Sequence, residues 1–481
     1  MAGTTLLQNA LVVDGTGKAA YRGDVLIEGE TIAQIGAIDA ASAERVVDCA
    51  GLVVAPGFID VHTHDDAIVL DKPAMLPKIS QGITTVVVGN CGISLTPVIT
   101  TAPIEPLGLL GAQRFCFARL AEYADAVDAA RPAVNVAALI GHTSLRAATM
   151  PQFERAATAD ERARMARQLR LAMDDGAVGL SSGLFYGNAF AADERELIEV
   201  ATAAAQAGGV YATHIRTEFE GILEAMREAA RTARHSGLPL VFSHHKCTGP
   251  ENWGRTRETL ALIDRLATHQ PVGLDVYPYT AGSTVLREDL VDGVIEILIT
   301  GSEPHPEMAG MRLADIAALW GIGQREACRR LSPGGACYFQ MNEEDVQRVL
   351  AHPRTMIGSD GLPHDVRPHP RLWGAFPRVL GHYTRELGLL KLESAIFKMT
   401  GLPAAQFRLE KRGTLAAGHP ADITVFDPQR IRDRASFAEP EQVSEGVRHV
   451  FVNGALSYEE DAATPASYPR NGRFLRRSDD R

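Results

Sequence analysis

The chain is poor in cysteine, with six residues scattered over 481 positions and no paired spacing among them. In a chain of this length, that scatter favours reduced thiols in the cytoplasm over a disulfide framework. Positive charge is also scarce, because 48 lysines and arginines face 59 aspartates and glutamates and leave a net charge of −11. We therefore expect neither nucleic acid nor an anionic membrane surface as a partner.

Long hydrophobic runs are absent as well, and no apolar stretch approaches the length of a membrane span. The first ten residues contain neither a basic segment nor a long apolar one, so we expect no signal peptide. With 46% hydrophobic and 22% charged residues, the composition is that of a soluble globular protein with room for more than one domain. Nothing in the sequence indicates the oligomeric state.

Both ends of the chain contain short strand-like runs separated by glycine and aspartate, which favour turns. Such runs fill residues 4–55 and recur near the C-terminus. Because neither end has enough strands to cover a core by itself, we expect residues 1–55 and 412–481 to pair into one small β-sandwich domain. The charged stretch 471–481 is expected to fray.

Between these ends, apolar strand-like runs alternate with helix-like runs, a pattern typical of parallel βα units. Residues 159–174, for example, predict a helix that begins near Asp160 and ends at Gly176. Eight such units over roughly 250 or more residues match an α/β fold of the (β/α)8 TIM-barrel type, which we place at 56–411. A doubly wound open sheet is disfavoured because no G-x-G-x-x-G follows an early strand. The eight predicted strands are 57–64, 83–92, 134–142, 177–185, 209–216, 239–246, 272–279 and 355–361.

The segment between the seventh and eighth predicted strands is too long for one loop and one helix. Residues 285–345 contain two helical patterns and a short apolar run. Long segments of this kind inside a compact fold are usually functional lids. We therefore expect an inserted subdomain over the mouth of the barrel.

Residues with metal-binding chemistry lie where the predicted strands end. His62 and His64 stand two positions apart on the first strand, so their imidazoles project to the same face. In a barrel, side chains from the carboxyl ends of several strands converge. Imidazole, thiolate and carboxylate are zinc ligands, so the sequence predicts a zinc site at this end of the barrel. The other candidates are Cys91 on the second strand, His214 on the fifth, either His244 or His245 on the sixth, and Asp360 on the eighth.

Longer motifs give the sequence a resemblance to a known family. Three of them are Pro-Gly-Phe-Ile-Asp-Val-His-Thr-His at 56–64, Gly-Asn-Cys-Gly at 89–92 and Gly-Ser-Asp-Gly-Leu-Pro at 358–363. The sequence resembles the amidohydrolase superfamily and, within it, the D-aminoacylase (N-acyl-D-amino-acid deacylase) family. The resemblance spans nearly the whole chain, including the split β domain and the insert. Further matching pieces lie at 141–146, 211–214, 243–246 and 275–279.

The resemblance implies two metal positions, one with a tightly bound Zn²⁺ and a second that is weakly or partially occupied. It also implies that Asp360 is the general acid/base and that a set of polar side chains binds the substrate carboxylate. The tight position would be formed by Cys91, His214 and His244, and the second by His62, His64 and Asp360. The carboxylate would be bound by Lys246, Tyr277 and Arg371, with Tyr186 and Ser283 nearby.

These residues suit hydrolysis of a linear amide. Zinc lowers the pKa of bound water to about 7 and polarises an amide carbonyl. A carboxylate within reach of that water can take its proton and pass it to the leaving amine. We expect a small-molecule substrate, an N-acyl-D-amino acid, to be split into a carboxylate and a free D-amino acid. The D configuration follows from the resemblance and not from these residues.

The side-chain preference is expected to depend on residues 284–291, after the seventh strand. Arg287 is the only cation there, and Glu288 and Asp289 beside it would repel a second carboxylate. Neutral or hydrophobic substrates are therefore favoured, with an N-acyl-D-glutamate or D-aspartate deacylase as the alternative. A cyclic-amide hydrolase, like dihydroorotases and hydantoinases, is a second alternative, but those enzymes use a carboxylated lysine where Cys91 fits here. The complete ligand set disfavours a non-enzymatic scaffold.

Overall fold

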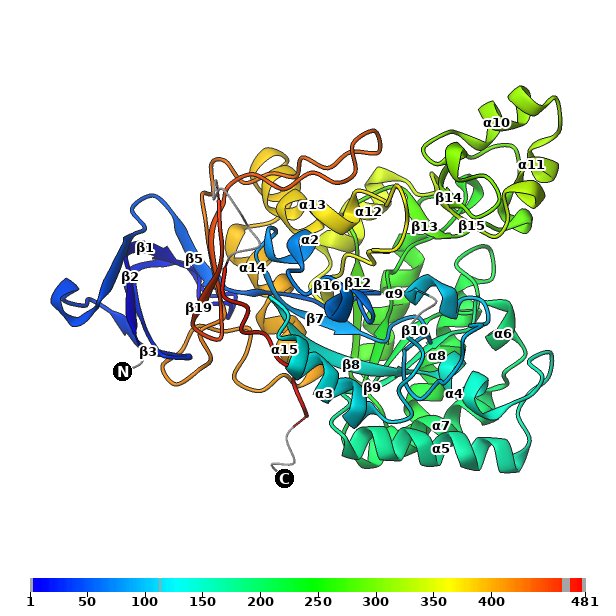
Figure 1. Cartoon of the computed structure of the whole chain (residues 1–481), viewed down its shortest axis with the longest axis horizontal. Helices are drawn as coiled ribbons and strands as arrows, with labels where there is room; N and C mark the ends of the chain where they lie inside the picture. Colours follow the sequence, from blue (N-terminus) through cyan, green and yellow to red (C-terminus); the bar gives the residue numbers. More distant parts are fainter. Residues whose placement is uncertain (1–2, 112–113, 461–467, 478–481) are drawn as a thin grey trace.

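The computed structural model describes residues 3–111, 114–460 and 468–477. Figure 1 shows a small β domain at the left, an α/β barrel in the middle and a further lobe with α10 (Leu313–Trp320) and α11 (Gln324–Leu331) at the upper right. None of the described helices is both long and apolar enough to cross a membrane.

The barrel consists of eight parallel strands, and each lies within one of the eight predicted ranges. Neighbouring strands pair in sequence order, and the ends of the sheet meet where Thr63 bridges Gly361. The N–H of Asp360 donates to the carbonyl of His62 at 2.7 Å across the same seam. The (β/α)8 fold is thus confirmed. Its strands are β6 (Phe58–Asp60), β7 (Ile83–Val88), β8 (Asn135–Gly141), β9 (Gly179–Gly183), β10 (Val210–His214), β11 (Leu240–Phe242), β12 (Val272–Val276) and β16 (Thr355–Ile357).

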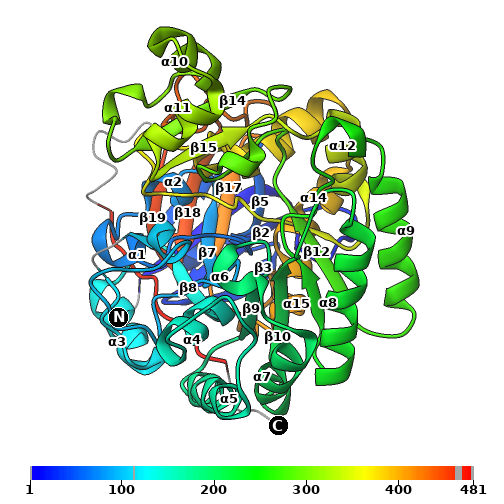
Figure 2. The ribbon, with the colours of Figure 1, turned by 90° about the vertical axis from the view of Figure 1, so that its right-hand side faces the viewer.

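Helices surround the strands, as Figure 2 shows with α5, α7, α8 and α9 at the outside of the sheet. The predicted helix 159–174 is present with the same bounds, because Thr158 and Glu161 form a reciprocal capping box at its start. The longer helices are α3 (Leu120–Ala130), α5 (Ala159–Asp174), α7 (Glu194–Gln206), α8 (Ile222–Ser236), α9 (Thr256–Ala267) and α12 (Glu343–Ala351). The helix α14 (Leu392–Met399) has eight residues. Other short helices are α1 (Ile68–Asp71), α2 (Leu76–Ile79), α4 (His142–Thr149), α6 (Gly187–Phe190) and α13 (Arg371–Arg378).

Apolar side chains fill the interior of the barrel. Inward-facing residues such as Val61, Leu139 and Val241 are fully buried in one cluster. The helix α15 (Gly401–Phe407) adds Phe407 to this cluster from outside the sheet. The interior is therefore a packed core, and polar side chains can gather only beyond the strand ends.

The small β domain joins the two ends of the chain in one eight-stranded sheet. The strand before the barrel, β5, pairs antiparallel with β17, with Val54 opposite Val425. The sheet encloses an apolar cluster. Distant parts of the sheet meet where the N–H of Ile32 in β3 donates to the carbonyl of His419, just before β17. The two ends thus pair as predicted. The strands are β1 (Thr4–Val12), β2 (Tyr21–Glu28), β3 (Thr31–Gly36), β4 (Arg45–Asp48), β5 (Val53–Pro56), β17 (Ile423–Phe426), β18 (Val447–Val452) and β19 (Ala455–Glu459).

The expected fraying of the C-terminal stretch is wrong for residues 471–477, and residues 478–481 lie outside the described part. The carbonyl of Arg473 accepts the N–H of Val136 at 2.9 Å, and the N–H of Leu475 donates back to Val136 at 2.7 Å. Phe474 between them is only 3% exposed. The tail therefore docks beside β8, since one buried phenylalanine and two backbone hydrogen bonds offset its charge.

The lobe between β12 and β16 is built on a three-stranded antiparallel sheet in the order β13-β15-β14. It has its own apolar cluster, in which Ile299, Leu313 and Tyr338 are fully buried. Since it folds around a core of its own, we keep the inserted subdomain (285–345) and the division into 56–411 and 1–55 with 412–481 as a proposal. The strands are β13 (Gly282–Val285), β14 (Ile297–Ser302) and β15 (Gly334–Tyr338).

Candidate metal centre and active site

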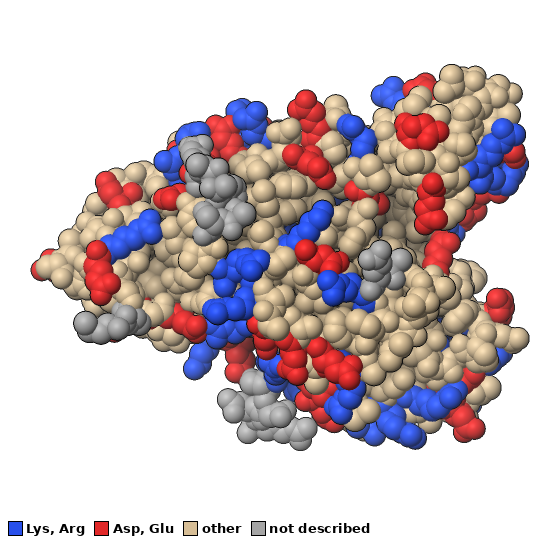
Figure 3. All heavy atoms as spheres, in the orientation of Figure 1, with Lys and Arg blue, Asp and Glu red and all other residues tan. Residues whose placement is uncertain are grey.

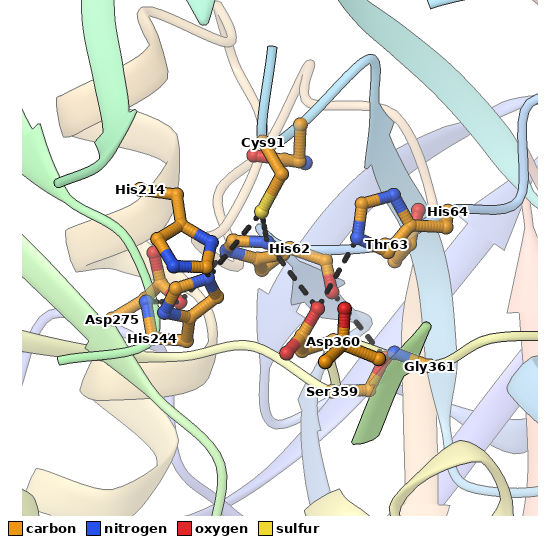
Figure 4. Close-up of polar contacts among 12 residues, drawn as sticks. His62, Thr63, His64, Cys91, His214, His244, Asp275, Ser359, Asp360 and Gly361 are labelled. Carbon is orange, nitrogen blue, oxygen red and sulfur yellow. Dashed lines mark hydrogen bonds and ion pairs between the residues drawn. The ribbon is translucent and has the colours of Figure 1, made fainter. Parts of the chain in front are cut away.

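The strand-end candidates converge beyond the carboxyl ends of the barrel strands (Figure 4). Two sets of ligand atoms each lie within 4.8 Å of one another, and every residue in them is buried. The first set is Cys91, His214 and His244, and the second is His62, His64, Cys91 and Asp360.

Cys91 belongs to both sets and lies between them. Its Sγ is 3.3 Å from Nε2 of His244 and 3.2 Å from Nε2 of His62. On one side, Nδ1 of His214 lies 3.1 Å from Nε2 of His244. On the other, Oδ1 of Asp360 lies 3.2 Å from Nε2 of His64. The thiolate can therefore serve either position, or both.

The backbone at three of these residues lies in the left-handed region, with φ of 52° at Cys91, 35° at His244 and 49° at Asp360. Such angles are strained for residues other than glycine and persist only where the surroundings enforce them. Here the enforcing bonds include the N–H of His244, which donates to the carboxylate of Asp275 at 2.8 Å. Strain gathered at three ligand positions is typical of a functional site.

The loop that bears Cys91 is enclosed by its neighbours. The N–H of Gly92 donates to Oγ of Ser181 at 3.0 Å, and the N–H of Ser144 donates to the carbonyl of Gly92 at 3.2 Å. A Cβ at Gly183 would lie 2.1 Å from the carbonyl oxygen of Cys91, so this loop can approach only a glycine there. Ser144 belongs to the matching piece at 141–146, which thus helps to hold the loop that bears the Cys91 thiol.

The electrostatics of the centre favour a thiolate. Burial acts to raise the pKa of the Cys91 thiol, but His62 and His244 hold that pKa well below its usual value. Thiolate sulfur and imidazole nitrogen are ligands of zinc, whose own charge would keep the thiol ionised and the imidazoles neutral. The residues therefore fit a zinc ion.

Two carboxylates behind the ligands were missed by the sequence reasoning. Oδ1 of Asp275 lies 3.1 Å from Nδ1 of His62, on the ring face turned away from Cys91. Oε1 of Glu218 lies 3.2 Å from Nδ1 of His244. Asp275 is the first residue of the matching piece at 275–279, and this motif could have identified it as a candidate. Glu218 lies in a loop with no local sequence signal.

A cavity opens beside the ligands. Lys246, Tyr277, Tyr186 and Ser283 line it, together with His64, His214, His244 and Asp360. Arg371 lies deeper and is fully buried, with Nη1 2.8 Å from Oδ2 of Asp360 and its guanidinium over the ring of Tyr277. The cavity therefore brings cations and hydroxyls next to the metal ligands.

Comparison of the sequence with known proteins identifies the family of this chain. The model of the amidohydrolase family matches residues 45–458. The chain belongs to the amidohydrolase family. A D-aminoacylase from Alcaligenes xylosoxydans xylosoxydans is 50% identical over 462 residues, which cover 95% of each chain.

Two solved relatives share the whole architecture with this amidohydrolase. One is a D-aminoacylase with a binuclear metal centre, in which one metal activates the enzyme and a second attenuates it. It is 49% identical to this chain and has a TM-score of 0.95, and the match covers 98% of this chain and 99% of the relative. The other is an N-acyl-D-glutamate deacylase from Bordetella bronchiseptica, complexed with zinc and a phosphonate inhibitor that mimics the tetrahedral intermediate. It is 45% identical, covers 99% of this chain and 100% of its own, and has a TM-score of 0.95. The resemblance to the D-aminoacylase family is confirmed.

The far wall of the cavity in this amidohydrolase is apolar, with Leu290 and Tyr338 from the inserted lobe and Phe185 from the barrel. The ring of Phe185 stacks on His214, with 4.9 Å between the centroids. Arg287 also lies over the Phe185 ring, 4.2 Å from its centroid, and its guanidinium pairs with Asp289 at 2.5 Å. The cation that the sequence singled out is thus already partnered.

Proposed function

We propose that this amidohydrolase is a zinc-dependent hydrolase that splits N-acyl-D-amino acids into a carboxylate and a free D-amino acid. The observation that carries the proposal is the convergence of Cys91 with His214 and His244 beside a cavity that the cationic Lys246 lines. The near full-length identity with a D-aminoacylase supports the same reaction. A small-molecule substrate fits the cavity, and the six free cysteines support a cytoplasmic location.

Zinc would be held tightly by Cys91, His214 and His244, while His62 and His64 with Asp360 would line a second, weaker position. Zinc in the tight position would polarise the amide carbonyl and lower the pKa of a coordinated water. The protein contributes the geometry, because the ligands come from the ends of several strands and are held by buried neighbours. Sharing of Cys91 between the sets supports unequal occupancy of the two positions.

Asp360 is proposed as the general acid/base. Burial acts to raise the pKa of this carboxyl, but Arg371 and His62 hold it well below the usual value, so at neutral pH the group is in the ionised form that a general base requires. It takes a proton from the attacking water and gives it to the departing amine nitrogen. Among the described residues, it is the carboxylate that both joins a metal set and lines the cavity.

The substrate α-carboxylate is proposed to lie near Lys246 and Tyr277. The Nζ of Lys246 lies 5.8 Å from the centroid of the Tyr277 ring, and both line the cavity. Tyr186 and Ser283 stand at the same wall and offer hydroxyls. Arg371 lies behind Tyr277, where it holds Asp360 and adds positive potential to the carboxylate site.

Neutral or hydrophobic D-amino acids are the proposed substrates. Leu290, Tyr338 and Phe185 offer an apolar wall to the side chain, and Arg287 is neutralised by Asp289. An N-acyl-D-glutamate or D-aspartate deacylase is the alternative, because Arg287 lies next to that wall. A cyclic-amide hydrolase is not favoured. The inserted lobe supplies several wall residues, so we propose that it acts as the lid of the cavity.

A screen of N-acetyl-D- and N-acetyl-L-amino acids tests the proposal. The zinc-loaded protein should release acetate from D-leucine and D-methionine derivatives, with much lower rates for L-forms and for D-glutamate derivatives. Removal of zinc with a chelator should abolish turnover, and readdition should restore it. A protein that binds no zinc, or that hydrolyses none of these compounds, would refute the proposed function.

A further inference from the structure

Glu218 is a buried carboxylate that the proposed reaction does not use. It stands in the loop after β10, four residues beyond His214, and it is only 5% exposed. Its position is fixed by the backbone, because its carbonyl accepts the N–H of Thr248 at 2.9 Å. A charged group buried at this depth requires partners, and its contacts reveal what it holds.

One oxygen of Glu218 faces both histidines of the proposed tight zinc position. Oε1 lies 3.2 Å from Nδ1 of His244 and 3.8 Å from Nε2 of His214. These are the ring nitrogens that point away from the centre, since Nε2 of His244 faces Cys91 and Nδ1 of His214 faces Nε2 of His244. Only the contact with His244 is within hydrogen-bond range, and Nε2 of His214 has no hydrogen-bond partner among the described residues.

This arrangement decides which ring nitrogen carries the proton. A histidine that binds a metal through one nitrogen must carry its proton on the other, and a carboxylate behind the ring accepts that N–H. Lys246 creates a conflict, because its Nζ lies 3.0 Å from Nδ1 of His244. If Lys246 donated to Nδ1, the ring proton would move to Nε2 and block the metal. Glu218 removes the conflict by accepting from both groups.

The same oxygen also holds Lys246. Nζ of Lys246 lies 2.6 Å from Oε1 of Glu218. This short contact between a largely buried ammonium and a buried carboxylate fixes the position of the lysine. We infer that Glu218 is a positioning residue. It sets the tautomer of the zinc-binding His244 and anchors the lysine for the substrate carboxylate, and it thereby couples zinc affinity to substrate binding. The part about substrate rests on the proposed function.

Glu218→Gln tests the inference because it keeps the shape and removes the charge. Zinc affinity is measured by competition with a chelator, and the Cd²⁺–thiolate charge-transfer band reports whether Cys91 still binds metal. We expect zinc to bind about 10- to 100-fold more weakly, with KM raised for N-acetyl-D-amino acids. Zinc affinity within twofold of the wild type would overturn the tautomer role, whatever the activity.

Two control variants separate the effects. Lys246→Met should raise KM and leave zinc affinity unchanged. Glu196→Gln removes another buried carboxylate, which pairs with His142 and Arg146, and should leave both quantities unchanged. In the double variant Glu218→Gln/Lys246→Met, KM should match that of Lys246→Met alone, because the effect of Glu218 on KM passes through the lysine.

If the increases in KM from Glu218→Gln and Lys246→Met were fully additive in the double variant, Glu218 would not act on substrate binding through Lys246, and the proposed coupling would be overturned. If the wild-type protein hydrolysed no N-acyl-D-amino acid at all, the proposed function would fail. The zinc and cadmium measurements would still test the role of Glu218 in that case. Thermal denaturation of each variant shows that the folded protein is compared throughout.

Discussion

Nη1 of Arg371 lies 2.8 Å from Oδ2 of Asp360, in a pair almost wholly shielded from water. The other oxygen of the same carboxylate faces His64 at 3.2 Å. Asp360 thus connects a fixed cation with the metal ligands. The guanidinium keeps the carboxylate ionised, and Asp360 also lines the cavity.

Asp360→Ala should therefore separate metal binding from turnover. We expect kcat to fall by at least about 10²–10⁴-fold, because the proton acceptor is lost. The tight zinc should stay, since Cys91, His214 and His244 are unchanged. Zinc content by atomic emission and kcat on an N-acetyl-D-amino acid give the two readings. A variant with substantial activity would contradict the assignment of the general base.

Cys91→Ala should remove the tightly bound zinc and abolish activity, because the thiolate joins both ligand sets. His62→Ala should retain one zinc per chain, since it touches the second position. Cys49→Ala is the matched control, as Cys49 is fully buried in the small β domain. A zinc titration checks all three, and retention of tight zinc in Cys91→Ala would contradict the ligand set.

Lys78→Met should destabilise the barrel without changing any proposed ligand. Nζ of Lys78 is fully buried, 2.9 Å from Asp60 and 3.3 Å from Asp65, and it donates to Oγ of Ser359 at 2.7 Å. Breaking such a buried pair costs about 3–5 kcal/mol, because the carboxylates remain without a partner. Denaturation followed by circular dichroism measures the loss. The exposed Lys72 offers a control, and equal stability of Lys78→Met and Lys72→Met would rule the network out as a stabilising feature.

Glu196→Gln should lower stability in a pH-dependent way. Burial acts to raise the pKa of Glu196, but His142 and Arg146 lower it to about 2. A carboxyl with a depressed folded pKa stabilises the fold above its unfolded pKa of about 4.3, and this contribution disappears as the pH falls toward the folded value. The difference in Tm from the wild type should thus be largest at neutral pH and shrink between about pH 4.3 and 2. A difference that stays constant across that interval would count against the ion network.

Asp289→Asn should shift substrate preference toward acidic side chains. The change releases Arg287, which lies 4.2 Å from the Phe185 ring beside the apolar wall. We expect the ratio of kcat/KM for N-acetyl-D-glutamate to that for N-acetyl-D-leucine to rise about tenfold, the effect of one partly exposed ion pair of roughly 1.4 kcal/mol. Asp315→Asn, on the exposed face of α10, serves as control. An unchanged ratio would show that Arg287 cannot reach the substrate.

The sequence allowed the barrel and the ligand positions to be predicted because both have local signals. Apolar runs such as Ile83–Val88 are typical of buried parallel strands, and the ligand types stand directly after them. His62 and Cys91 could be placed at the same end of the barrel in advance because strand ends converge there. The contact between Cys91 and His62, which puts the thiol in both ligand sets, was not predicted.

The features that could not be predicted depend on contacts between distant residues. Glu218 lies in a loop, and its meeting with Lys246 depends on how two loops pack. Asp275 and His62 are separated by 213 positions, so no local pattern links them. The tail was misjudged for the same reason, because the charge around Phe474 is visible in the sequence whereas its binding groove beside Val136 is not.

The pairing of β5 with β17 also has a consequence during synthesis. Val53–Pro56 emerges from the ribosome long before its partner Ile423–Phe426 is made. At translation rates of about 5–20 residues per second, this strand edge waits roughly 20–80 s. During that interval it presents unpaired N–H and carbonyl groups next to a run of apolar residues. The small domain can therefore be completed only once about the last sixty residues have been synthesised.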